Sequence, residues 1–96
     1  MSFSFHPEAD EEYLSAIDWY EERSPGLGLD FSAEMRGAIN RAESMPLAWQ
    51  MVEPDIRRVL VRRFPYAVVY GPNNGGIYIL AVMHLRREPG YWLGRH

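Results

Sequence analysis

The chain has 96 residues, no cysteine and a formal net charge of -3. This length suits one domain with one modest core and leaves little room for a deep pocket built from several loops. Without cysteine, the chain has no disulfide, no thiol nucleophile and no thiolate metal site. No segment resembles a secretion signal, and proline and glycine interrupt the uncharged stretch from residue 64 to 85. We therefore expect a cytoplasmic chain that does not span a membrane.

The charge is distributed unevenly along the chain. Residues 1–55 hold three arginines and twelve acidic residues, a net charge of -9, whereas residues 56–96 hold seven arginines and one glutamate, a net charge of +6. We expect the two halves to form an acidic surface and a basic surface. All ten basic residues are arginine. This choice suits planar contacts to phosphate or carboxylate groups, and biased codon usage in a GC-rich genome explains it equally well.

The first half of the chain predicts a short strand and two helices. Residues 3–5 alternate like a strand, and Pro7 with the acidic residues after it is typical of a helix start. Apolar residues then recur on one helical face as far as Tyr20, and the same spacing recurs from about Leu29 to Ser44. The short SPGLG segment between these helices predicts an antiparallel helical hairpin.

The second half predicts a small sheet. The segment LAWQMVEPD has no clear period and indicates a connector whose Trp49 packs against the core. Strands are expected over residues 56–64, 66–70 and 77–85, and Asn74-Gly75 predicts a hairpin between the last two. The tail REPGYWLGRH is expected to be irregular. The order β-α-α-β-β-β predicts a single α+β domain over residues 1–96, with the helical hairpin on one face of an antiparallel sheet.

Six arginines stand in doublets around this predicted sheet, at positions 57–58, 62–63 and 86–87. Alternation along the first long strand places Arg58 and Arg62 on the face away from the core valines. We expect that face to be open, with Tyr91 and Trp92 of the tail nearby. Arginines interleaved with aromatic residues suit phosphate contact and base stacking. The alternative is that these arginines are solvated or pair with the acidic helices.

His84 stands near the end of the last predicted strand, where alternation groups it with Tyr78, Leu80 and Val82. It is a candidate general acid or base beside Arg86. The alternative is a half-buried histidine that forms a hydrogen bond with a backbone group.

Other chemical motifs are absent from the sequence. The three histidines show no ligand spacing, and no phosphate-binding glycine loop or serine-hydrolase motif occurs, so we expect no metal and no cofactor. The acidic pairs at positions 11–12 and 21–22 are expected on the solvent side of the first helix rather than as an acid and base pair.

Five stretches, taken in order, resemble the RelE/ParE toxin superfamily, especially members described as plasmid stabilisation proteins. They are FSFHPEA, AIDWYEE, SPGLGLDF, RRFPYAVVY and AVMHLRREPGYW. The resemblance runs from Phe3 to about Arg95. It implies the same order of helices and strands, and a toxin of a type II toxin-antitoxin pair held inactive by a cognate antitoxin. Such antitoxins wrap around the toxin, so the resemblance also implies apolar surface that is exposed when this chain is alone.

The resemblance leaves two targets open. RelE-like members cut messenger RNA on the ribosome, and by resemblance Arg62, His84 and Arg86 would be catalytic residues in such an endoribonuclease. ParE-like members inhibit DNA gyrase by binding. The strand YAVVY lacks the arginine that the ribonucleases tend to carry early in that strand, and the chain has no lysine. Both departures favour the ParE-like branch, although a non-toxic relative that only binds its antitoxin also fits.

The ParE-like interpretation implies a binding surface in the basic half of the chain. Its members would be Arg58, Arg62, Arg63, Arg86, Arg87, Tyr91 and Trp92. The partner of this surface would be the antitoxin or the target.

Overall fold

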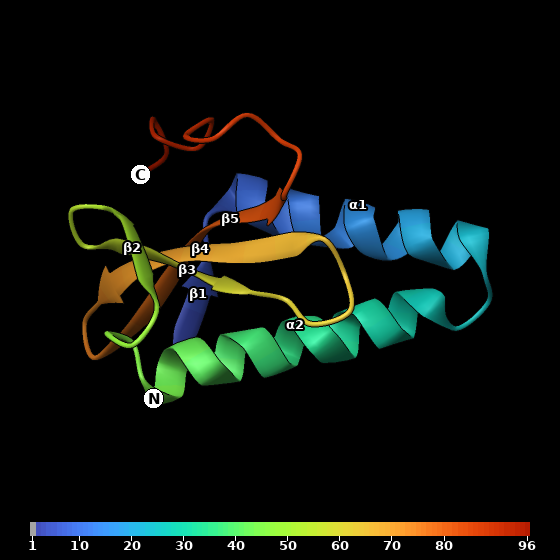
Figure 1. Cartoon of the computed structure of the whole chain (residues 1–96), viewed down its shortest axis with the longest axis horizontal. Helices are drawn as coiled ribbons and strands as arrows, with labels where there is room; N and C mark the ends of the chain where they lie inside the picture. The colour runs from blue at the N-terminus through green and yellow to red at the C-terminus, as the bar shows by residue number, and fades with distance from the viewer. Residues whose placement is uncertain (1) are drawn as a thin grey trace.

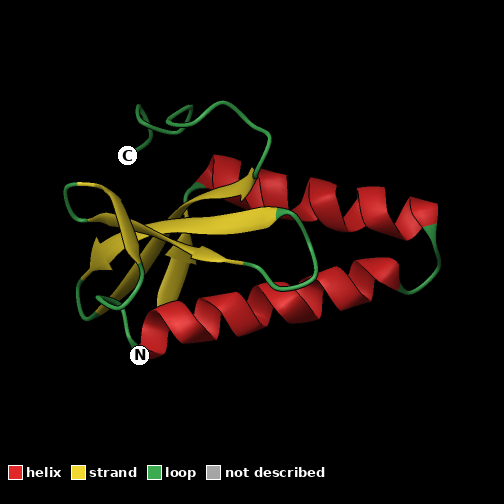
Figure 2. Ribbon diagram, in the orientation of Figure 1, coloured by secondary structure: helices red, strands yellow, loops and turns green. Residues whose placement is uncertain are grey.

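The computed structural model describes residues 2–96 and consists of a helical hairpin, a sheet and a C-terminal segment in layers (Figures 1 and 2). The elements are β1 (Phe3–Phe5), α1 (Pro7–Arg23), α2 (Leu27–Ser44), β2 (Gln50–Glu53), β3 (Ile56–Leu60), β4 (Tyr66–Asn73) and β5 (Gly76–His84). The α+β class and the helical hairpin packed on a sheet are confirmed.

The sheet has five strands in the order β1-β5-β4-β3-β2, and two details of its prediction are wrong. The segment predicted as a connector contains β2, which pairs antiparallel with β3 at the sheet edge. An edge strand this short has too few residues to show a period of two. The sheet is also mixed rather than antiparallel, because β1 pairs parallel with β5 in the register Phe3↔Ile77 to Phe5↔Ile79.

Local chemistry explains how the helical hairpin forms. The imidazole Nδ1 of His6 accepts the backbone N–H of Glu8, which caps the first turn of α1 after Pro7. Gly26 adopts a positive φ of 88° between the helices, and the Glu21 carboxylate accepts the N–H groups of Gly26 and Gly28. These contacts start α2 at Leu27, two residues earlier than predicted.

The hairpin between β4 and β5 is confirmed. Asn74 and Gly75 have φ values of 43° and 82°, as a two-residue turn requires. Strand β3, which precedes this hairpin in the chain, is shorter than predicted, because it ends at Leu60 rather than at residue 64. Residues 61–65 form a loop in which Arg63 has a φ of 69°. Arg58 and Arg62 therefore do not share one strand face as predicted.

Apolar side chains form two clusters, one on each face of the sheet. The larger lies between the sheet and the helices around Phe31, Met35 and Ile79, and Trp49 packs against it as predicted. The smaller lies under residues 85–96, which we call the C-terminal strap. Figure 1 shows this strap on the side of the sheet away from α2. The prediction of an open face is therefore wrong, although the absence of helix and strand in the tail is confirmed.

No helix among residues 2–96 is long and apolar enough to cross a membrane. Within the same residues, no group of three histidine or acidic side chains is placed to hold a metal ion.

Candidate functional site

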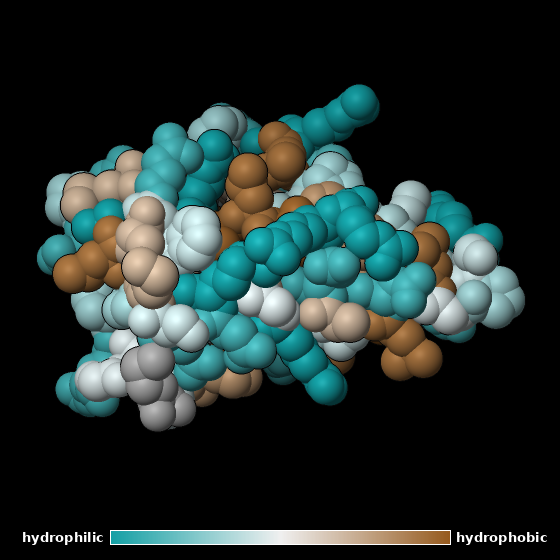
Figure 3. All heavy atoms as spheres, turned by 60° about the horizontal axis from the view of Figure 1, so that its bottom comes forward, coloured by the Kyte–Doolittle hydropathy of each residue, from teal (hydrophilic) through white to brown (hydrophobic). Residues whose placement is uncertain are grey.

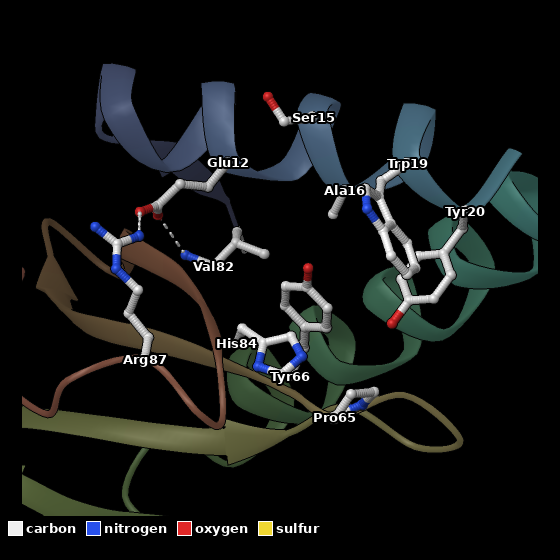
Figure 4. Close-up of a pocket in the computed structure, with 10 residues that line it drawn as sticks. All are labelled: Glu12, Ser15, Ala16, Trp19, Tyr20, Pro65, Tyr66, Val82, His84 and Arg87. Carbon is white, nitrogen blue, oxygen red and sulfur yellow. Dashed lines mark hydrogen bonds and ion pairs between the residues drawn. The ribbon is translucent and has the colours of Figure 1, made fainter. Parts of the chain in front are cut away.

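A groove of about 550 Å³ opens between α1 and the ends of β4 and β5. Figure 4 shows the helix forming one wall, with Tyr66 and His84 on the opposite side and Trp19 and Tyr20 at one end. The lining residues are Glu12, Ser15, Ala16, Trp19, Tyr20, Pro65, Tyr66, Val82, His84 and Arg87. We call this cavity the α1–β5 groove. Its lining is mostly apolar and aromatic, and its charged groups lie at the end marked by Glu12 and Arg87.

A β-bulge in β5 places His84 in the groove. The pairing shifts from Tyr70↔Ile79 to Val69↔Ala81, so Leu80 is the extra residue. A bulge reverses the alternation of the side chains that follow it. Val82 therefore faces the helices, and the predicted grouping of His84 with Tyr78 and Leu80 is wrong. Those two residues belong to the cluster under the strap.

His84 is half-buried and its Nδ1 atom accepts the backbone N–H of Arg86 at 3.0 Å. Its ring also meets the Tyr66 ring edge-on, with centroids 5.1 Å apart. The hydrogen bond to a backbone group matches the second of the two predicted roles for this histidine. Nε2 remains as the ring nitrogen that can face a partner in the groove.

Glu12 joins α1, β5 and the strap at the other end of the groove. Its carboxylate accepts hydrogen bonds from the Val82 N–H at 3.0 Å, the Tyr91 hydroxyl at 2.8 Å and both terminal nitrogens of Arg95 at 2.9 Å. Arg87 lies 3.9 Å away. The prediction that Glu12 lies on the solvent side is wrong, since its side chain is only 17% exposed.

The same contacts set the protonation of this cluster. Burial alone would raise the pKa of Glu12, but the hydrogen bonds from Arg95, Tyr91 and Val82 and the charge of Arg95 outweigh it and lower the pKa. Burial raises the pKa of the Tyr91 hydroxyl strongly, and its hydrogen bond to Glu12 adds to this rise. The carboxylate is therefore ionised and the phenol neutral near pH 7.

The sequence-predicted tail residues have unequal exposure. Arg87 stacks on the Tyr91 ring with its guanidinium carbon 3.9 Å from the centroid, and 55% of its side chain is exposed. Arg86 is exposed beside it. Trp92 is only 5% exposed and packs in the cluster under the strap. The prediction that Trp92 is available to a partner is therefore corrected, because its ring is an internal anchor of the strap.

The arginines of the two earlier doublets also lie in different surroundings. Arg63 lies 3.7 Å from Asp30 and 3.8 Å from Glu34 on α2, as the alternative of pairing with the acidic helices predicted. Arg62 is exposed, and no acidic side chain among residues 2–96 forms an ion pair with it.

Arg58 lies outside the α1–β5 groove. Its Nε donates to Gln50 of β2, and its side chain lines a smaller cavity of about 240 Å³ under the strap. The structure thus brings His84, Arg86, Arg87 and Tyr91 together at one end of the sheet and leaves Arg58 apart from them.

Sequence reasoning missed Glu12 and Arg95. Glu12 stood in an acidic run typical of a solvated helix face, and Arg95 stood alone near the chain end. One signal was available. Glu12 lies one residue before Tyr13 and four before Ala16, so it borders the apolar face of the helix.

The fold and the groove define the class of this protein: a small α+β domain with a helical hairpin on a mixed sheet, and basic residues gathered at one sheet end. A family model described as the ParE toxin of the type II toxin-antitoxin system, parDE, matches residues 3–89. The chain belongs to this ParE toxin family, which confirms the resemblance noted in the sequence.

A solved structure described as "Chromosomal ParDE TA system from P. aeruginosa" has a similar fold. The TM-score is 0.75 at 17% sequence identity, and the match covers 90% of this chain and 97% of that chain. At this identity the likeness shows the fold alone. No curated protein matches the chain.

Proposed function

We propose that this chain is a gyrase-inhibiting toxin that binds its target through the basic end of the sheet and is neutralised by a cognate antitoxin. Membership of the ParE toxin family supports the class of target. The protein would act in the bacterial cytoplasm, where such a pair stabilises a plasmid or other replicon.

One observation favours binding over catalysis. Arg63, Arg87 and Tyr91 hold or contact acidic groups of this chain itself. Their doublet neighbours Arg62 and Arg86 form no ion pair within residues 2–96, and only the backbone N–H of Arg86, not its guanidinium group, contacts His84. Ribonuclease chemistry requires a base and a cation that converge on one phosphate. Exposed arginines at a sheet end need only meet a complementary acidic surface.

An antitoxin partner would explain the apolar surface. Exposed large apolar side chains include Leu14, Trp19, Leu29, Met45, Leu47 and Met51. Figure 3 shows apolar patches beside the polar row of α2. Apolar side chains that gather into a surface patch, unlike single scattered ones, are typical of sites that a partner covers. The similar P. aeruginosa structure is described as a ParDE system, which supports the same kind of partner here.

A second function is favoured by the position of His84. This histidine lies with Tyr66 and Arg87 in the α1–β5 groove, so a titratable ring and a guanidinium share one cavity. This geometry supports an acid or base role for His84 in the alternative function, a ribosome-dependent endoribonuclease. The other two residues predicted for that enzyme, Arg62 and Arg86, do not line the groove. A non-toxic module that only binds its antitoxin is the third.

The test is pulse labelling of DNA and protein synthesis just after the chain is induced in a bacterial host without antitoxin. The proposal expects DNA synthesis to fall first, and the purified chain to block supercoiling by DNA gyrase. An earlier fall in protein synthesis, with messages cut on ribosomes and protected by His84→Ala, would establish the ribonuclease instead. Unimpaired growth at high expression would leave only the antitoxin-binding module.

A further inference from the structure

The C-terminal strap (residues 85–96) crosses one face of the sheet without regular secondary structure. Trp92 anchors it by packing against residues such as Val69 and Ala81. Apolar packing of this kind stabilises the strap but does not fix its direction, because the hydrophobic effect is not directional. The position of the arginines in the strap must therefore be set by other contacts.

Glu12 and Arg95 supply those directional contacts. The two side chains form a two-pronged pair at 2.9 Å, and they are 17% and 10% exposed. Arg95 also donates to the Leu80 carbonyl oxygen at 2.9 Å. Buried charges are tolerated when both are paired and their remaining hydrogen-bond capacity is used. The pair fulfils this condition, so it ties the end of the strap to α1 and to β5.

Arg87 is positioned by this cluster but keeps its charge for a partner. Its ion-pair contact with Glu12 is long, at 3.9 Å, whereas Arg95 makes the short contacts that neutralise the carboxylate. The Tyr91 ring lies under the Arg87 guanidinium and donates its hydroxyl to Glu12. Stacking on a ring held in this way restricts a flexible side chain that is otherwise half exposed.

We propose that Glu12 and Arg95 form a latch that closes the strap and, through Tyr91, positions Arg87 at the end of the α1–β5 groove for contact with a protein partner. Neither residue would touch the partner. Both are positioning residues. The part of the inference that concerns a partner rests on the proposed function, whereas the latch itself is a property of the free chain.

Hydrogen exchange in the full free chain tests the latch. The reporters are the strap amides of Arg87, Leu93 and Arg95, which donate to backbone carbonyls in the structure. Glu12→Gln is expected to reduce their protection about tenfold or more, since the charged acceptor of the hydrogen bonds from Arg95 is replaced by a neutral amide. Glu11→Gln is the matched control. It removes the same charge from the neighbouring exposed residue and is expected to leave the protection unchanged.

A second measurement follows the Arg87 side chain. In the wild-type chain, the nearby Tyr91 ring is expected to shift the NMR signal of the Arg87 Nε–H group away from that of a free arginine. Glu12→Gln and Arg95→Lys should both return this signal to the free position. Arg95→Lys keeps the charge and loses the planar fork, so it also serves if the Glu12 variant does not fold.

A double-mutant cycle on growth inhibition tests the positioning role. If Glu12 acts through Arg87, then Glu12→Gln and Arg87→Gln each weaken inhibition by about tenfold, and the double variant is also weaker by about tenfold. Independent roles would give losses that multiply to about a hundredfold.

Each outcome decides a separate point. Unchanged strap protection in both latch variants overturns the latch, whatever the protein does in the cell. If the strap amides lose protection but the two losses of growth inhibition multiply in the double variant, the positioning role is overturned. If the wild-type chain inhibits no growth, the proposed function fails, and the exchange and NMR measurements still decide the latch.

Discussion

At the scale of single residues, neighbours in the arginine doublets have different roles. Arg63 pairs with α2 while Arg62 is exposed, and Arg87 stacks on Tyr91 while Arg86 is exposed. Adjacent side chains in extended or turn segments point in different directions, so one arginine meets the protein and the other meets solvent. The doublets at positions 62–63 and 86–87 thus each combine one arginine side chain that is held by this chain with one that is not, whereas Arg57 and Arg58 both donate hydrogen bonds within the chain.

The first residue-scale prediction concerns the doublet in the strap. Replacing Arg86 and Arg87 with glutamine is expected to abolish growth inhibition, because both guanidinium groups lie at the proposed contact surface. The fold should survive, as neither side chain is buried. Growth after induction and circular dichroism check the two parts. The double variant Arg23→Gln, Arg36→Gln makes the same charge change on the helices, and retained toxicity of the strap variant alone would refute the assignment.

The second residue-scale prediction concerns the core. Phe31 is fully buried, and its ring lies within 6.3 Å of the rings of Tyr13, Tyr20, Phe64 and Tyr66. Phe31→Ala is expected to lower the free energy of unfolding by about 3–5 kcal/mol, because it leaves a cavity among these rings. Urea denaturation measures this change in the free energy of unfolding. Leu29→Ala, two residues earlier and 76% exposed, should change the stability by less than about 0.5 kcal/mol.

At the scale of elements, the two helices depend on a close approach at Gly28. A Cβ atom there would lie 2.8 Å from the carbonyl oxygen of Ile17, which belongs to the backbone of α1 and cannot move aside. Gly28→Ala is thus expected to destabilise the fold by about 1–3 kcal/mol. Gly37→Ala is the control in the same helix, where the nearest group is a flexible Arg41 nitrogen at 3.4 Å.

The control substitution Gly37→Ala is expected to change the stability in the opposite direction. Alanine is about 0.5–1 kcal/mol more favourable than glycine inside a helix, so Gly37→Ala should stabilise the chain. Thermal unfolding of the two variants distinguishes the cases. Equal effects of both substitutions would show that helix propensity, and not the helix contact, sets the requirement at Gly28.

The strands show where element prediction succeeds and fails. The turn at Asn74-Gly75 was predictable because its residues favour positive φ locally. The bulge at Leu80 was not predictable, because no local residue preference requires it and the pairing with β4 decides it. That bulge determines which face His84 occupies, so the candidate site could not be placed from alternation alone.

At the scale of the whole molecule, stability is expected to depend on the ionisation of Glu12. Its pKa in the folded chain is lowered from the ordinary value of 4.5, so below neutral pH the unfolded chain takes up the proton first. The stabilisation by this carboxylate is fully present above about pH 4.5 and is lost as the pH falls through the folded pKa. Acid should therefore loosen the attachment of the strap to α1.

The measurement is urea unfolding of the wild type and Glu12→Gln at pH 7 and pH 3. The difference in free energy of unfolding between them should be largest at pH 7 and shrink at pH 3, since the variant has no carboxylate to protonate. Glu11→Gln is the control, because Glu11 is exposed and takes no part in the contacts of Glu12. A constant difference for Glu12→Gln would mean that its ionised form does not stabilise the fold.

The sequence by itself determined the α+β class, the helical hairpin, the last β-hairpin and the ParE toxin family, because helical spacing, turn residues and ordered motifs are local properties of the chain. Only the tertiary structure decided the parallel pairing of β1, the groove, the burial of Trp92 and the meeting of Glu12 with Arg95. That last pair lies 83 residues apart in the chain. Contacts between distant residues depend on how elements pack, and no local pattern of residues encodes them.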